Sequence, residues 1–187
     1  MNIFLLLGIV CGVLVLFLLI SLFNYNSLIK FSNLIAEAWS GINVQLKKRH
    51  DLIPNLVEIV KGYSKHEKTL LEEITKYRSA AISSNSIEKK AQAEAGITDT
   101  LKTLFAVAEN YPDLKANSNF LALQDDLRSI ENDIQYARRY YNGVTRDYNN
   151  MVQRFPSNLV ANLFNFTAKP YFELSSEQEA TNPQVKF

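Results

Sequence analysis

Cysteine is almost absent from this chain. The 187 residues include a single one, Cys11, which lies inside an apolar stretch. One cysteine can form neither an intrachain disulfide nor a multi-cysteine metal site, so cysteine usage gives no indication of the compartment. Glycine and proline are also scarce, at six and five residues, which is too few for a chain built from many β-turns. These scarcities argue against a disulfide-rich or turn-rich β protein.

An excess of charge of one sign is also missing. Lysine and arginine number 20 against 19 aspartate and glutamate, giving a net charge of +1. A nucleic-acid-binding protein normally carries a basic face, so no nucleic acid partner is expected. The chain lacks a Gly-x-Ser-x-Gly elbow, a phosphate-binding glycine loop, a His-Glu-x-x-His motif and the paired Glu-x-x-His motifs of dinuclear bundles. We therefore predict no catalytic residue, no metal site and no cofactor.

A long apolar run stands at the N-terminus. Ile3 to Phe23 contains no charged residue, and as a helix it would measure roughly 31 Å, close to the bilayer hydrocarbon thickness of about 30 Å. A cleaved signal peptide is the main alternative. However, neither residue before the apolar run, Met1 or Asn2, is basic, and no small-residue cleavage site follows the run. We predict a retained single-pass anchor, with the lipid bilayer as partner of residues 3–23. Lys30, the first basic side chain, favours a cytoplasmic domain at the cell membrane.

Helical periodicity dominates the rest of the chain. Apolar residues recur at three- and four-residue steps, which indicates amphipathic helices, and no alternating strand pattern occurs. The first helix is expected to continue from the anchor to about His50. Asp51 would then cap a second helix with Pro54 in its first turn. Turn residues at 83–86 and 110–113 end the second and third helices. The fourth stripe is the most regular and runs from Phe120 to Phe155.

These patterns predict an all-α fold: an N-terminal transmembrane helix continuing into an antiparallel four-helix bundle with coiled-coil-like packing. The expected boundaries are 1–23 for the anchor, 24–155 for the bundle, 156–172 for a membrane-proximal apolar segment and 173–187 for a disordered tail. Antiparallel order would bring two polar loops, Lys47–Asn55 and Tyr111–Asn119, together at the membrane-distal tip.

Several strings of the chain resemble the LemA family: Glu37–Ser40, Val44–Val57, Tyr111–Asn117, Ala137–Asn142 and Phe155–Ala161. The resemblance follows family order from the anchor to about Phe172. It implies a bacterial membrane-anchored antiparallel helical bundle, in a group that includes a magnetosome-associated member. The resemblance implies no reaction and no catalytic residues. Residues 80–94 and those after Glu173 diverge, so predictions there depend on local sequence alone.

The two expected tip loops concentrate polar and charged residues suited to recognition. A solvated helix end is the alternative interpretation of the cluster at 47–50; the two are nearly balanced, and the gathering of polar residues from both loops slightly favours recognition. The residues expected to bind a protein partner are Lys47, Lys48, Arg49, His50, Asp51, Asn55, Tyr111, Asp113, Lys115 and Asn117. Glu67 and Glu94 fall on apolar stripes. An unpaired buried carboxylate is costly, so we expect both to face solvent through an irregular register.

Large apolar residues follow the fourth helix. They either lie at the lipid interface or fold back over the base of the bundle, and the sequence does not separate these alternatives. The residues expected at a membrane interface are Leu159, Leu163, Phe164, Phe166, Tyr171 and Phe172.

The leading functional hypothesis is a membrane-tethered, non-enzymatic binding or scaffold module that recognises a protein partner at its distal tip; a homo-oligomer is left open. The alternative is an enzyme or enzyme component with a concealed His/carboxylate site. A pocket that brings His50 against a buried carboxylate would favour the enzyme, and a convex solvated tip would favour the binding module.

Overall fold

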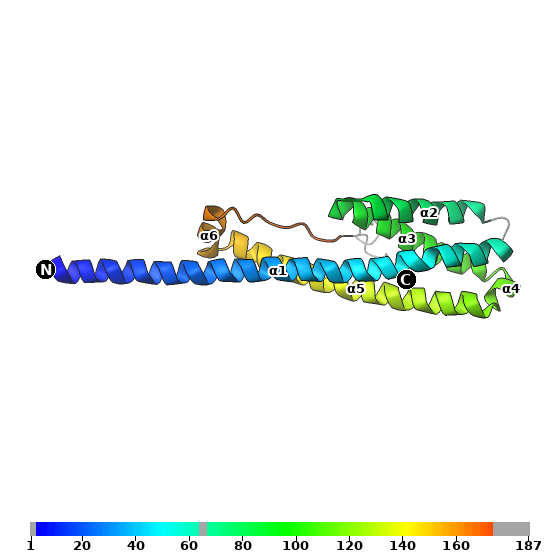
Figure 1. The fold of residues 1–187 in the computed structure, drawn as a ribbon, viewed down its shortest axis with the longest axis horizontal. Helices are drawn as coiled ribbons and strands as arrows, with labels where there is room; N and C mark the ends of the chain where they lie inside the picture. The colour runs from blue at the N-terminus through cyan, green and yellow to red at the C-terminus, as the bar shows by residue number, and fades with distance from the viewer. Residues whose placement is uncertain (1–2, 64–66, 174–187) are drawn as a thin grey trace, which may run out of the picture. The chain divides into compact units, whose positions relative to one another are not determined.

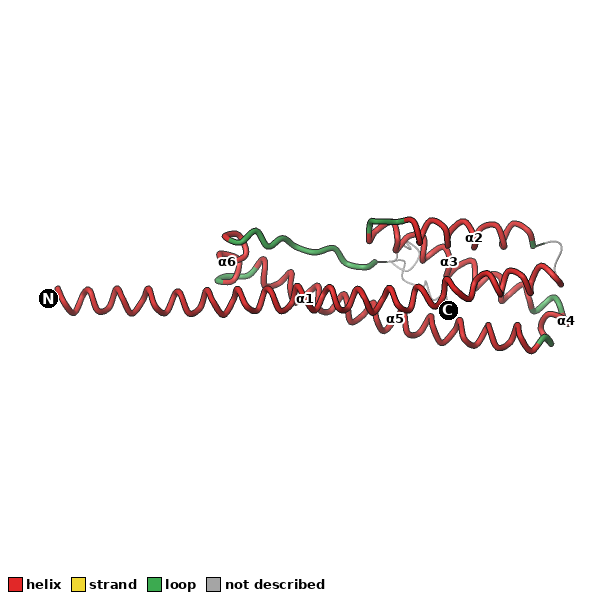
Figure 2. The backbone as a smooth tube through the Cα atoms, viewed as in Figure 1, coloured by secondary structure: helices red, strands yellow, loops and turns green. Residues whose placement is uncertain are grey.

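The computed structural model describes residues 3–63 and 67–173. The described residues form helices joined by short loops and contain no strand (Figure 2), which confirms the predicted all-α class. The helices are α1 (Ile3–Tyr63), α2 (Lys68–Ser83), α3 (Ile87–Ala108), α4 (Pro112–Lys115), α5 (Ser118–Gln153) and α6 (Ser157–Leu163). His66 and residues 174–187 of the predicted disordered tail lie outside the described residues.

The chain divides into two compact units. The first contains residues 1–40 and 140–170, and the second contains residues 41–139 and 171–187. The long helices α1 and α5 each contribute one part to each unit (Figure 1). α2, α3 and α4 belong wholly to the second unit, and α6 belongs to the first.

The N-terminal part of α1 is apolar around its whole circumference. It is long and apolar enough to cross a membrane, and its most apolar window contains no buried residue. Its large side chains, such as Phe4, Leu14 and Phe23, are exposed. A core helix of a soluble protein would be mostly covered, so this stretch is not a core helix of the described part of the chain.

The prediction that the first helix ends near His50 is wrong. α1 continues without interruption to Tyr63 (Figure 1), so residues 47–55 form no loop. Asp51 does not cap a helix; its carboxylate pairs with Lys47 one turn earlier, at 2.7 Å. Pro54 sits inside the helix, although proline normally kinks or breaks a helix because it has no N–H to give the carbonyl four residues before it.

The carbonyl released by Pro54 belongs to His50, and it has another donor. Arg78 of α2 donates its Nε–H to the His50 oxygen at 2.8 Å. A buried carbonyl without a partner costs about 1–3 kcal/mol, so this side chain replaces what the helix loses at Pro54. The interaction also connects α2 to α1 at that point.

The second unit has one continuous core. It is formed by apolar residues from α1 to α5, and α2 and α3 pack extensively against each other. The buried members are Ile53, Leu56, Val60, Leu71, Ile74, Ala81, Ala93, Ile97, Leu101, Leu104, Ala108, Leu114, Phe120 and Leu127. Most of them are stripe positions predicted from periodicity, which is why the amphipathic faces meet in one core.

The helix ends agree with the turn signals where polar caps are present. Ser86 accepts a hydrogen bond from the Lys89 N–H at the start of α3. Asn117 Oδ1 accepts from the N–H groups of Asn119 and Phe120 at the start of α5. Both are N-caps that satisfy helix-terminal donors. The expected turn at 110–113 leads into a further short helix, α4, which begins at Pro112.

The first unit contains the apolar end of α1, the second half of α5, and α6. Leu28 and Ile35 of α1 and Tyr148 of α5 are buried in it. The rings of Trp39 and Tyr141 pack with centroids 5.6 Å apart. These contacts place the predicted stripes of α1 and α5 inside a packed interior.

Candidate functional site

Arg49 is, with Glu94, the most deeply buried charged residue among those described in the second unit. It occupies the position between Leu46 and Ile53 on the buried stripe of α1, and only 1% of its surface is exposed. The helix continues through it, so a residue expected in a solvated loop lies in the core. A buried guanidinium needs partners for its N–H groups, because removing a charge from water is costly.

The partners of Arg49 come from α3 and α5. Nη1 donates to Glu131 Oε2 at 2.6 Å and to Thr98 Oγ1 at 2.9 Å, and Nη2 donates to the Glu94 carboxylate. We call Arg49, His50, Glu94, Thr98 and Glu131 the Arg49 cluster. One guanidinium thereby joins three helices through charge-assisted hydrogen bonds.

Glu94 is buried, with 1% of its surface exposed, so the expectation that it faces solvent is wrong. Its second oxygen lies 2.8 Å from His50 Nε2. Glu67, the other carboxylate of this kind, is half-buried and accepts a hydrogen bond from the Tyr111 hydroxyl at 3.1 Å. The stripe register was therefore regular at Glu94, and a salt bridge compensates for its burial.

One guanidinium meets two carboxylates in the cluster. Arg49 binds both Glu94 and Glu131, and His50 lies against Glu94. Burial by itself raises the pKa of Glu94, but the hydrogen bond from His50 and the positive charge of Arg49 together outweigh it and hold that pKa below its ordinary value. Glu94 is thus held as a carboxylate inside the core.

The hydrogen bonds of the cluster connect α1, α3 and α5, but its residues are suited to few kinds of chemistry. Among the described residues, no three His, Cys, Asp or Glu side chains gather in a way that could hold a metal ion. A hollow of about 300 Å³ borders His50 and is also lined by Arg78 and Lys90. His50 therefore lies between a buried carboxylate and a hollow, which is the arrangement named above as favouring an enzyme.

The residues expected at one distal tip are separated by the unbroken α1. Arg49 and His50 are buried, while the other four on α1 stay exposed along the helix. Asn117 adjoins the end of α1 instead, because it donates to the Tyr63 hydroxyl at 2.9 Å, and the Tyr111 hydroxyl donates to Glu67 at the start of α2. The single tip made from both loops is wrong in its geometry. Partner binding by the exposed members, which are Lys47, Lys48, Asp51, Asn55, Asp113 and Lys115, stays a prediction.

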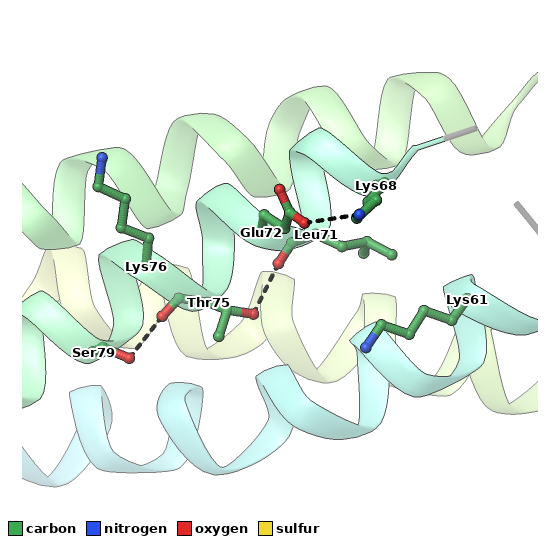
Figure 3. A pocket seen from close by; sticks show the side chains of 7 residues that line it. All are labelled: Lys61, Lys68, Leu71, Glu72, Thr75, Lys76 and Ser79. Atoms are coloured by element: carbon green, nitrogen blue, oxygen red, sulfur yellow. Dashed lines mark hydrogen bonds and ion pairs between the residues drawn. The ribbon is translucent and has the colours of Figure 1, made fainter. Parts of the chain in front are cut away.

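A groove between α1 and α2 was not predicted from the sequence. It encloses about 650 Å³, has the buried Leu71 at its base and carries three lysines for one glutamate (Figure 3). Lys61 comes from α1, across from the α2 residues. The lining residues are Lys61, Lys68, Leu71, Glu72, Thr75, Lys76 and Ser79, and we call this surface the α1–α2 groove. In the sequence, its polar residues are indistinguishable from an ordinary solvent-exposed helix face, so no pattern indicated a groove.

The predicted membrane-interface residues fall into two groups. Leu159, Leu163, Phe164 and Tyr171 are exposed. Phe166 is half-buried in the first unit. Phe172 is completely buried in the second unit, where the Arg138 guanidinium stacks 5.6 Å from its ring. Its assignment to a membrane interface is therefore wrong, because a buried ring cannot contact lipid.

Comparison with known proteins gives a consistent result. A family model described as the LemA family matches residues 38–187. The chain is 30% identical to Protein LemA of Metamycoplasma hominis over 73% of its length and 63% of that protein. It is 21% identical to magnetosome protein MamQ 2 of Paramagnetospirillum magneticum, over 81% of this chain and 65% of the relative. The matches thus span less than two thirds of each relative's length. On the strength of the family match, which covers the Arg49 cluster and most of the chain, this chain belongs to the LemA family.

Proposed function

We propose that this protein is a membrane-tethered, non-enzymatic binding module. The observation that carries the proposal is the exposed apolar stretch of α1 at residues 3–23, which leads into the second unit as one uninterrupted helix. A bilayer supplies the cover that the chain itself does not provide. Lys30 favours a cytoplasmic second unit through the positive-inside tendency.

The second unit is proposed to be an antiparallel four-helix bundle. α2 and α3 are joined by a turn of three residues and pack against each other, which is typical of antiparallel neighbours. The Arg49 cluster supports this arrangement because it connects the interior of α1 with α3 and α5. Such a bundle would hold its outer helix faces in fixed positions for a partner.

The partner is proposed to be an acidic amphipathic helix in the α1–α2 groove. Leu71 offers an apolar base and Lys61, Lys68 and Lys76 offer positive charge. Lys68 forms an exposed ion pair with Glu72 at 3.7 Å, and such pairs contribute little and exchange readily. Helix-in-groove recognition uses this combination of an apolar contact and complementary charge at the rim.

Single-cysteine labelling tests both the tether and the groove. In a Cys11→Ala background, Thr75→Cys places a thiol in the groove and Lys48→Cys places one on exposed α1 surface. A membrane-impermeant maleimide should label both only after cell lysis. Labelling in intact cells would place the second unit outside and overturn the proposed orientation, and recovery in the soluble fraction would overturn the tether.

The same variants report on groove occupancy. With the purified full chain in detergent, a glutamate-rich amphipathic peptide of roughly 18 residues, long enough to be helical, should slow labelling at Thr75→Cys at least several-fold. Labelling at Lys48→Cys should not change. A peptide with lysines in place of its glutamates is the matched control. Equal effects of the two peptides, or equal protection at both cysteines, would exclude charge-specific binding in the groove.

An enzyme or enzyme component is the second candidate, and the His50–Glu94 contact beside a hollow favours it. A histidine oriented by a carboxylate is a common general base. A base must be reachable, and in a His66→Gln background His50 is the only histidine. We expect diethyl pyrocarbonate to modify His50 at least tenfold more slowly in the folded than in the urea-unfolded chain. Similar rates in the two states would favour the enzyme.

A further inference from the structure

The exposed side of α6 and its flanking residues carries several large apolar side chains beside the exposed Asn162. Ser157, Val160 and Ala161 form its buried face, and the residues on the other side point away from the first unit. Leu163 is 74% exposed and Phe164 is 52% exposed. We call the exposed residues Phe155, Leu159, Leu163 and Phe164 the α6 patch. Neighbouring large apolar side chains on a surface indicate an interaction site.

The position of the patch is fixed against α1. The ring of Tyr25 lies 4.7 Å from the ring of Phe164 and 5.9 Å from that of Phe166. Tyr25 follows the last residue of the apolar stretch, Phe23, by two positions. All of these residues belong to the first unit. The patch therefore lies at the height where the apolar stretch of α1 ends (Figure 1).

A defined turn holds the aromatic residues in place. Asn165 adopts a left-handed conformation with φ of 58°. The N–H of Phe166 donates to the Ala161 carbonyl at 2.8 Å, and the N–H of Asn165 donates to the Asn162 carbonyl. These two bonds form a Schellman motif, which ends a helix and satisfies its last carbonyls. The motif ends α6 at the turn between Phe164 and Phe166, whose rings both pack against Tyr25.

The chain after the turn is fastened to α5. Asn149 exchanges two hydrogen bonds with the backbone of Lys169, at 2.9 and 2.8 Å. Tyr141 donates its hydroxyl to the Pro170 carbonyl at 2.9 Å. Both ends of the segment containing α6 are thus attached to one helix, so the exposure of the patch is a feature of the folded unit.

The charge pattern around the patch suits a lipid surface. Residues 155–168 contain no charged side chain, and the flanking charged residues, Arg154 and Lys169, are both basic and exposed. Aromatic and leucine side chains are favoured at the boundary between headgroups and acyl chains, and basic side chains beside them contact lipid phosphates. A protein partner would need neither this height nor this flanking charge.

We infer that the α6 patch inserts into the headgroup–acyl boundary of the bilayer that α1 spans, as a second, non-spanning membrane contact. The inference rests on the proposed tether. Insertion of Leu163 and Phe164 removes their exposed apolar surface from water. The first unit is then held to the membrane at two points, one on α1 and one on α6.

Depth-dependent fluorescence quenching tests this contact. Trp39 is the only tryptophan, so Trp39→Phe gives a silent background that keeps a ring against Tyr141. Leu163→Trp reports on the patch, Leu14→Trp on the middle of the apolar stretch, and Tyr136→Trp on an exposed position of the second unit. Each full-length variant is reconstituted in phosphatidylcholine–phosphatidylglycerol vesicles containing lipid brominated either high or deep in the acyl chain.

The expected pattern differs at each position. Leu163→Trp should be quenched at least twofold more by the shallow bromolipid than by the deep one, Leu14→Trp should show the reverse order, and Tyr136→Trp should be quenched by neither. Quenching at Leu14→Trp without quenching at Leu163→Trp would overturn the inference and leave the tether intact. A blue-shifted but unquenched Leu163→Trp would mean that a second copy covers the patch, which also overturns it. Absence of quenching at both positions would reject the tether itself.

Discussion

Replacing Arg49 with methionine should lower the free energy of unfolding by about 3–5 kcal/mol, the usual result of removing one partner from a buried ion pair. Methionine fills similar space but leaves the buried Glu94 carboxylate without its guanidinium. Glu131 and Thr98 lose the same donor. Urea unfolding of the full chain in mild detergent, followed by circular dichroism, measures the loss.

Acid provides a signature that a simple packing defect would lack. Glu94 has a lowered pKa in the folded protein, so its ionised form contributes stability above the ordinary pKa of about 4.3. That contribution disappears as the pH falls through the folded-state value. In Arg49→Met the buried Glu94 accepts a proton at little cost. The difference between the two proteins should therefore shrink as the pH falls below about 4.3.

Two variants serve as controls for the Arg49 prediction. Lys47→Met breaks an exposed ion pair on the same helix and should cost far less than Arg49→Met, because solvent screens such pairs. Adding Glu94→Met to Arg49→Met removes the stranded charge and should restore part of the loss. A cost for Arg49→Met no larger than that for Lys47→Met, or no recovery in the double variant, would show that the cluster does not stabilise the fold.

Gly96→Ala is expected to destabilise the protein, although alanine is the better helix former. A Cβ at Gly96 would lie 2.6 Å from ring carbons of Tyr77, so α2 and α3 would have to separate or the ring would have to move. Overpacking of this kind costs about 1–3 kcal/mol, against a gain of roughly 1 kcal/mol in helix propensity. The same urea titration should give a net loss.

Gly41→Ala is the matched control, since it is also inside a helix but has no atom within 4 Å of the added Cβ. It should raise the free energy of unfolding by up to about 1 kcal/mol. Combining Gly96→Ala with Tyr77→Leu should recover stability by clearing the ring. If both glycine variants stabilise equally, the close approach of α2 to α3 is not maintained in solution.

The helical class and most of the core follow from periodicity. The stripe through Phe120, Leu127 and Tyr148 is buried as expected, because one residue in every three or four was apolar without interruption. The error at His50 arose because Arg49 was treated as a helix end. The spacing Leu46, Arg49, Ile53 already continued the stripe, and Glu94 held the complementary position on α3. Recognising two opposite charges on two apolar stripes would have predicted their pairing.

Other features depend on tertiary structure and leave no local signal. No rule of sequence reveals that Arg78 supplies the donor that Pro54 lacks, since 24 positions separate them along the chain. The α1–α2 groove is similar, because its lysines are ordinary solvent-exposed residues until two helices bring them together. Phe172 was misplaced because an aromatic residue near an apolar segment can dock on protein as readily as on lipid.

The contact between Arg78 and the His50 carbonyl makes two distant positions depend on each other during divergence. If Pro54 changes to a residue with an N–H, α1 can satisfy the His50 carbonyl by itself, and the selective value of a donor at position 78 falls. If Arg78 changes first, the proline leaves a buried acceptor unpaired. Among related chains, the proline and the donor should accordingly be retained together or lost in that order, with the proline replaced first.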